Sequence, residues 1–108
     1  MKRKQYQQLL LDAADLIERT GWTQHWYTRD KRGLKVQFYD KAACRFCAFG
    51  AMLRVSPSET VLSAADKRMK AAVQDSVGTL WWVSWQDGLP ARSGKKTVIA
   101  MLRKAATL

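Results

Sequence analysis

Residues 5–21 of the chain read QYQQLLLDAADLIERTG, and this stretch predicts the first helix of the fold. Its apolar side chains recur at the three- and four-residue spacing of one helical face, while Asp12, Asp15 and Glu18 fall on the opposite face. Gly21 supplies the end of the helix, because glycine readily adopts the left-handed conformation that closes helices. We therefore expect an amphipathic helix that packs on a core.

A short β-hairpin is predicted after this helix. Aromatic and β-branched residues flank a turn-like run from Asp30 to Gly33, and the pattern pairs residues 24–29 with residues 34–39. Two strands alone are only marginally stable in water. The hairpin must therefore lean on helices.

Asp40 can cap a second helix over residues 41–55. Arg45 and Arg54 are almost its only polar side chains, so this helix should be central. Gly50 would let another element approach it closely.

The run Ser56-Pro-Ser-Glu59 predicts the start of a third helix. Ser56 suits the cap, the proline the first helical position, and Glu59 the reciprocal position of a capping box. The helical spacing continues to about Val77, and Gly78 ends it.

The last part of the chain predicts an irregular tryptophan-rich segment and one more helix. Gly and Pro interrupt residues 79–90, and Ser93 can cap a helix to about Ala106. At 108 residues, we expect residues 1–108 to form a single, mainly α domain of about four helices with a short β-hairpin between the first two.

The formal charge of the chain is +10, although 47% of its residues are hydrophobic. A disordered basic tail could not carry so much apolar matter, so the charge must lie on the outside of a packed domain. The sequence therefore favours a polyanionic partner, namely nucleic acid or a nucleoprotein complex. Solubility, or an acidic surface on a partner protein, is the alternative explanation of the same charge.

Eight basic residues are the candidates for phosphate contact because they fall on a predicted hairpin tip or on outward helix faces. They are Arg29, Lys31, Arg32, Lys35, Lys67, Lys70, Lys96 and Arg103. If the partner is a protein instead, an exposed aromatic residue could form the centre of the interface. Trp82 and Trp85 are the candidates for that role, although most tryptophans of a small domain belong to its core.

Cys44, Cys47 and His25 are the residues that could carry chemistry. A tetrahedral zinc site needs four ligands and one histidine is available, so we expect no metal. A cysteine–histidine nucleophile would need a thiol near a helix start with His25 opposite, which leaves a cysteine-dependent enzyme as a minor alternative. There is no glycine-rich phosphate loop and no serine nucleophile elbow, so we expect no cofactor and no catalytic residue.

The sequence indicates neither a signal peptide nor a membrane-spanning segment, because its apolar stretches are far shorter than a bilayer requires. Two cysteines suit a protein whose thiols stay reduced. We expect a cytoplasmic protein that does not bind membranes.

Several short motifs resemble a family of small bacterial, largely actinobacterial, and phage proteins known as a domain of unknown function. Its members read Gly-Trp-Cys-Gln, Arg-Asp, Cys-x-x-Gly-Ala, Trp-Asn-Asp and Arg-Thr in order. The counterparts here are Gly21 to Gln24, Arg29 and Asp30, Cys47 to Ala51, Trp85 to Asp87, and Arg92 and Ser93. Thr23 stands in place of the usual Cys and Gln86 in place of the usual Asn. The resemblance implies a small, mostly helical domain of phage or prophage origin and no known activity.

These observations together predict a non-enzymatic basic accessory protein that binds nucleic acid or a nucleoprotein complex. The alternative is an inhibitor or adaptor that binds an acidic surface of a host complex, for example a defence complex.

Overall fold

The computed structural model describes residues 3–108, and three of the other helices pack around its first helix, α1 (Gln5–Arg19). One face of α1 is buried, and its last backbone N–H bond closes at Thr20. The predicted first helix is therefore confirmed. The buried residues of that face are Leu9, Leu10, Ala13, Ala14, Leu16 and Ile17.

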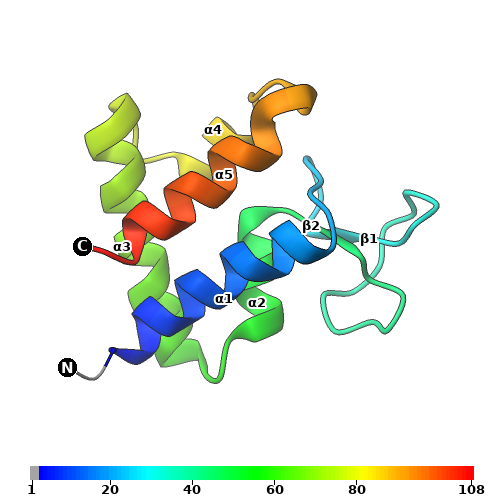
Figure 1. Cartoon of the computed structure of the whole chain (residues 1–108), viewed down its shortest axis with the longest axis horizontal. Helices are drawn as coiled ribbons and strands as arrows, with labels where there is room; N and C mark the ends of the chain where they lie inside the picture. Colours follow the sequence, from blue (N-terminus) through cyan, green and yellow to red (C-terminus); the bar gives the residue numbers. More distant parts are fainter. Residues whose placement is uncertain (1–2) are drawn as a thin grey trace.

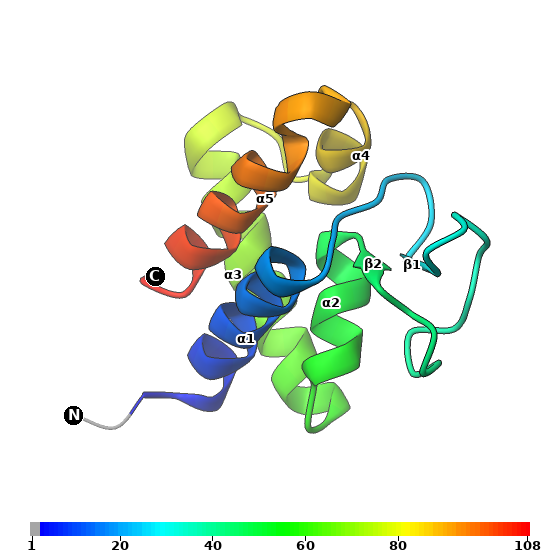
Figure 2. The ribbon, with the colours of Figure 1, turned by 45° about the vertical axis from the view of Figure 1, so that its right-hand side comes forward.

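The last helix, α5 (Ala91–Ala105), lies antiparallel beside α1, so the start of α1 and the end of α5 lie on the same side (Figures 1 and 2). Gly94 makes one contact of this region possible, because a β-carbon there would overlap the ring of Trp22. α5 begins two residues before the predicted cap, directly after Pro90, whose fixed φ suits the start of a helix.

The second helix, α2 (Ala48–Val55), is shorter than predicted. Residues 41–47 do not join it, since Arg45 and Phe46 form the strand β2 (Arg45–Phe46) instead. The backbone N–H of Phe46 donates to Gly21 O at 3.0 Å, and Phe46 is 1% exposed. Burial of this ring against α1 and its loop outweighs the local helical pattern.

An antiparallel strand pair lies between the first two helices, as predicted, but its second strand is a different segment. β1 (Thr28–Arg29) pairs with β2, so that Thr28 lies opposite Phe46. The predicted partner segment, residues 34–39, makes a single bridge from Lys35 to Arg29. Figure 1 shows this segment as an extended excursion beyond the two strands.

Two more helices complete the fold. The N-cap of α3 (Glu59–Val77) is Ser58 and not Ser56, because the Ser58 hydroxyl accepts the Val61 N–H at 3.2 Å. Gly78 ends it in the left-handed conformation with φ 78°, as predicted.

The predicted irregular segment contains a short helix, α4 (Trp82–Asp87), which gives five helices and not four. The prediction of a mainly helical fold is confirmed, and the elements form one globule. Within residues 3–108, no helix is long and apolar enough to cross a bilayer.

Candidate functional site

The segment between α1 and α2 is anchored where Tyr27 meets the start of α2. The N–H of Cys47 donates to the Tyr27 carbonyl oxygen at 3.0 Å. A β-carbon on Gly50 would overlap that same carbonyl, so only glycine allows the contact. The predicted close approach at Gly50 is confirmed.

Both carboxylates of this segment are bonded to backbone N–H groups. Asp30 Oδ1 accepts from Arg32 N at 2.9 Å and from Leu34 N at 3.0 Å, which holds the turn whose Gly33 has φ 85°. Asp40 Oδ1 accepts from Ala42 N at 2.8 Å in a second turn. These hydrogen bonds shape the loop, and they orient each carboxylate toward the backbone.

Arg29 and Arg54 hold the segment together through hydrogen bonds from their side chains. Arg29 donates to Thr23 Oγ1 at 3.0 Å and to Gly33 O at 2.9 Å. Arg54 donates to the carbonyl oxygens of Phe38 and Asp40 at 2.7 and 2.9 Å. Arg29 is therefore half-buried and bonded within the segment, and its contact with phosphate stays a prediction.

The remaining cations of the segment have exposed side chains, although Arg45 also donates to the Lys31 carbonyl oxygen at 3.3 Å, and we call residues 30–45 with these side chains the basic loop. Among residues 3–108, no carboxylate lies within 4.0 Å of any of them. The ammonium group of one, Lys35, lies 4.5 Å from the ring centroid of Trp26, which is 40% exposed. The five exposed cations are Lys31, Arg32, Lys35, Lys41 and Arg45.

The other predicted phosphate contacts lie on the helices and not on the basic loop. Lys70 forms an ion pair with Asp66 at 3.2 Å. Arg103 lies 3.5 Å from Asp15 and 3.3 Å from Glu18, across the α1–α5 contact.

Two further predicted contacts, Lys67 on α3 and Lys96 on α5, are exposed. Only Lys31, Arg32 and Lys35 of the eight predicted residues therefore share the basic loop with exposed side chains. Lys41 and Arg45 were missed because the sequence pattern assigned them to a helix.

The most exposed tryptophan is a different one from those that the sequence suggested. Trp82 is 2% exposed, and its indole N–H donates to Asp66 Oδ1 at 2.9 Å, so it belongs to the core. Trp85 is half-buried against the same core. Trp81, which directly precedes Trp82 in the chain, is 79% exposed beside Leu80, and it replaces Trp82 as the aromatic residue available to a partner.

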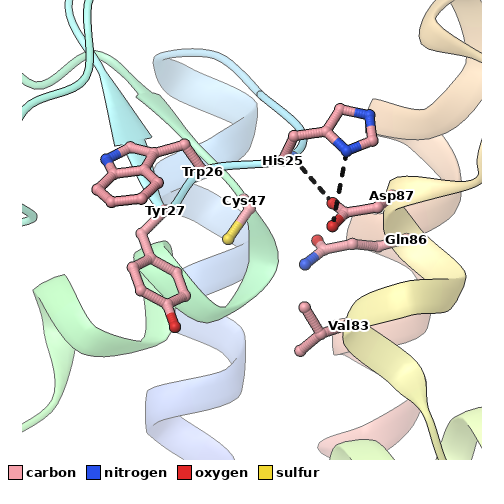
Figure 3. A pocket seen from close by; sticks show the side chains of 7 residues that line it. All are labelled: His25, Trp26, Tyr27, Cys47, Val83, Gln86 and Asp87. Carbon is pink, nitrogen blue, oxygen red and sulfur yellow. Dashed lines mark hydrogen bonds and ion pairs between the residues drawn. The ribbon is translucent and has the colours of Figure 1, made fainter.

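A pocket of about 250 Å³ lies between α4 and residues 25–27, which come just before β1 and the basic loop. Figure 3 shows its two walls, with Cys47 between them. The loop wall consists of His25, Trp26 and Tyr27, and the helix wall of Val83, Gln86 and Asp87.

Gln86 is fully buried and joins α4 to α2. Its Oε1 accepts the N–H of Ala48 at 2.9 Å, which satisfies one of the free donors at the start of α2. Its Nε2 has no nitrogen or oxygen acceptor among residues 3–108, and it lies beside the thiol of Cys47. Gln24 braces the same helix, because its amide nitrogen lies 2.9 Å from Gln86 O and 2.8 Å from Leu89 O.

Cys47 caps α2, since its Sγ accepts the N–H of Gly50 at 3.3 Å. Burial raises the pKa of the Cys47 thiol above its ordinary value, against the opposing hydrogen bonds from the backbone of Gly50 and Phe49 and from the Gln86 side chain. The sulfur is therefore a neutral lining atom at neutral pH. This environment does not activate it as a nucleophile.

His25 faces Asp87 and not the thiol (Figure 3). Its backbone has φ 67°, the one left-handed non-glycine residue within residues 3–108, and its N–H donates to Asp87 Oδ1 at 3.0 Å. The ring Nδ1 lies 3.8 Å from Asp87 Oδ2. The described part of the chain contains no group of three potential metal ligands.

A family model matches residues 1–108, and its description is a family of unknown function, DUF6197. The chain belongs to this family. No curated protein and no solved structure matches it.

Three of the short motifs meet at the pocket in this DUF6197 member. Gln24 ends the first motif, Cys47 and Gly50 belong to the second, and Gln86 and Asp87 to the third. Gln24 bonds to the backbone of α4, Gly50 accommodates Tyr27, and the other three residues line the pocket.

Proposed function

We propose that this protein is a non-enzymatic accessory protein that binds nucleic acid, alone or in a nucleoprotein complex, through the basic loop. The observation that carries the proposal is the contrast in how carboxylates are used. Three cations on the helices, Lys70, Arg103 and Lys104, are paired with carboxylates, whereas Asp30 and Asp40 bond to backbone N–H groups and leave the cations of the loop without a carboxylate partner among residues 3–108.

The charge and shape of the loop suit a phosphate backbone. Residues 29–45 contain six lysines and arginines and two aspartates, which leaves a formal charge of +4. Each cation placed against a phosphate releases condensed counterions, and this release supplies most sequence-independent affinity. Tyr39, which is 67% exposed, and Trp26 add aromatic faces on which unpaired bases can stack.

The test is a titration of the wild-type protein with a fluorescently labelled 20-nucleotide single strand and the corresponding duplex. If all five exposed cations of the loop contact phosphates, the logarithm of the affinity falls with the logarithm of salt with a slope of about −3.5 for the single strand, at about 0.7 per contact. Between about 50 and 200 mM salt, this slope is a loss of roughly 100-fold in affinity. Absence of binding at the lower salt concentration would contradict the proposal.

A second candidate function is supported by the exposed apolar group around Trp81. Val77 and Leu80 are 51% and 58% exposed beside it, and a large exposed aromatic is a common centre of a protein interface. In this alternative, the protein is an inhibitor or adaptor that binds an acidic surface of a host complex. A stoichiometric complex that persists after nuclease treatment and is lost in Trp81→Ala would favour it.

A further inference from the structure

The pocket beside the basic loop contains an unused hydrogen-bond donor. The Gln86 side chain is fully buried and its Oε1 is bonded to Ala48 N, whereas its Nε2 has no nitrogen or oxygen acceptor among residues 3–108 and faces only the Cys47 thiol, a weak acceptor. Figure 3 shows the amide nitrogen on the pocket side of Gln86, between the two walls. A buried donor without a strong acceptor costs about 1–3 kcal/mol, and a ligand atom that accepts from it would remove this cost.

An acceptor stands next to this donor. Asp87 lines the same pocket, and 29% of its side chain is exposed. One carboxylate oxygen accepts the His25 N–H, and a carboxylate has further lone pairs for ligand N–H groups. Adjacent donor and acceptor groups match the edge of a nucleobase, which presents both kinds of group side by side.

The size and walls of the pocket suit one flat ring system. Its volume of about 250 Å³ is slightly below the range of about 300–1,000 Å³ typical of drug-sized ligands. Trp26 and Tyr27 form one wall, and both remain partly exposed at 40% and 47%. Aromatic side chains of this kind stack on unpaired bases of any sequence.

The pocket is continuous with the basic loop. The Lys35 ammonium lies over the Trp26 ring at 4.5 Å, so one tryptophan serves as both the wall of the pocket and the support of a loop cation. A strand whose phosphates contact the loop would therefore have its bases within reach of the pocket. A base-paired duplex would not, because its bases are stacked inside the helix.

We propose that this pocket binds one unpaired nucleobase of a single-stranded nucleic acid, with Gln86 as hydrogen-bond donor, Asp87 as acceptor, and Trp26 and Tyr27 as stacking surfaces. The inference rests on the proposed function, since the basic loop would hold the phosphates of the same strand. It adds a preference for single strands, which the charge alone does not supply.

The first experiment compares two probes with the same phosphates on the wild-type protein. A 12-nucleotide thymidine strand should bind about tenfold or more tightly than a 12-nucleotide abasic strand, because stacking of one base is worth roughly that ratio. Equal affinities would overturn the base pocket and leave the proposed function intact, since phosphate contact alone would explain the binding.

A pair of variants locates the effect in the pocket. Val83 lines the pocket and is 39% exposed, so Val83→Trp should fill it, whereas Val77→Trp places the same side chain on an exposed position of α3. The preference for the thymidine strand should disappear in Val83→Trp and persist in Val77→Trp. A preference that survives in Val83→Trp, with its circular dichroism unchanged, would contradict the proposed site.

A third measurement separates failure of the pocket from failure of the loop. In Cys44→Ser protein, Cys47 is the single thiol and lines the pocket. Millimolar uridine 5′-monophosphate should slow its alkylation by iodoacetamide several-fold, and ribose 5-phosphate should not. If neither strand binds but the nucleotide protects, the proposed function fails and the pocket for a base stands; equal rates with both compounds would overturn the pocket.

Discussion

The helices and the basic loop use their charges in different ways. On the helices, Lys104 lies 2.8 Å from Asp75, and Arg103 lies near two carboxylates of α1. In the loop, Asp30 and Asp40 bond to backbone N–H groups, and the neighbouring cations have no carboxylate within 4.0 Å among residues 3–108. A formal charge of +10 therefore says less about a partner than the positions of the nine carboxylates do.

The largest loss of stability is expected from a substitution where the segment between α1 and α2 is attached to the helices. In Gly50→Ala, the new β-carbon would overlap the Tyr27 carbonyl, so the loop must shift away from α2. We expect a loss of about 2–3 kcal/mol in the free energy of unfolding, or about 10 °C or more in Tm. Thermal denaturation followed by circular dichroism measures the change.

Gly88→Ala is the matched control for this substitution. A β-carbon at Gly88 makes only ordinary contacts, with its nearest neighbour at 3.6 Å, and the backbone there has φ −88°. Its Tm should stay within about 4 °C of the wild-type value. If both alanine variants melt at the wild-type temperature, the loop is not anchored at Gly50.

A smaller loss of stability is expected when Cys47 is replaced, at the point where the chain enters α2. Replacing it with Ala removes the cap on Gly50 N and should cost about 1 kcal/mol at neutral pH. Burial raises the pKa of the folded thiol above 9.0, so the unfolded chain ionises first as the pH rises. The wild-type protein therefore loses stability from about pH 9 up to the folded pKa, and the Ala variant lacks this loss.

Denaturant unfolding of the two proteins across that pH range, each in the Cys44→Ser background, measures the difference. The free-energy gap between them should be largest below pH 9.0 and should shrink above it. A gap that stays constant or widens would mean that Cys47 is not held neutral by burial.

The sequence predicts the helices well where the signals are local. The apolar face of α1 and the left-handed Gly78 depend on neighbours within one or two turns, and both are present in the structure. Residues 41–47 also have a helical pattern, but Phe46 N bonds to Gly21 O and Cys44 N bonds to Arg29 O. These partners lie 15 to 25 positions away in the chain, so no local pattern reveals them.

The residues of the candidate site also divide into those with a local sequence signal and those without one. Lys31, Arg32 and Lys35 could be predicted from the turn beside them, because Asp and Gly mark such turns. The roles of Gln24 and Gln86 could not, since each amide bonds to a backbone 38 or more residues away. Paired Lys70 and Arg103 look the same in the sequence as unpaired Lys31, and only the fold distinguishes them.

The most direct test of the account compares two variants with the same net charge. Lys31→Gln/Arg32→Gln/Lys35→Gln removes three cations of the basic loop, and a control triple variant removes three cations that are paired on the helices. The controls are Lys70→Gln, Arg103→Gln and Lys104→Gln.

Titration of each with the labelled 20-nucleotide strand gives the affinity and its salt dependence. The account predicts that the loop variant binds about tenfold or more weakly, with a salt slope reduced by about 2, and that the control stays within about twofold of wild type. Equal losses in the two variants would contradict it, because binding would then follow the net charge and not the basic loop.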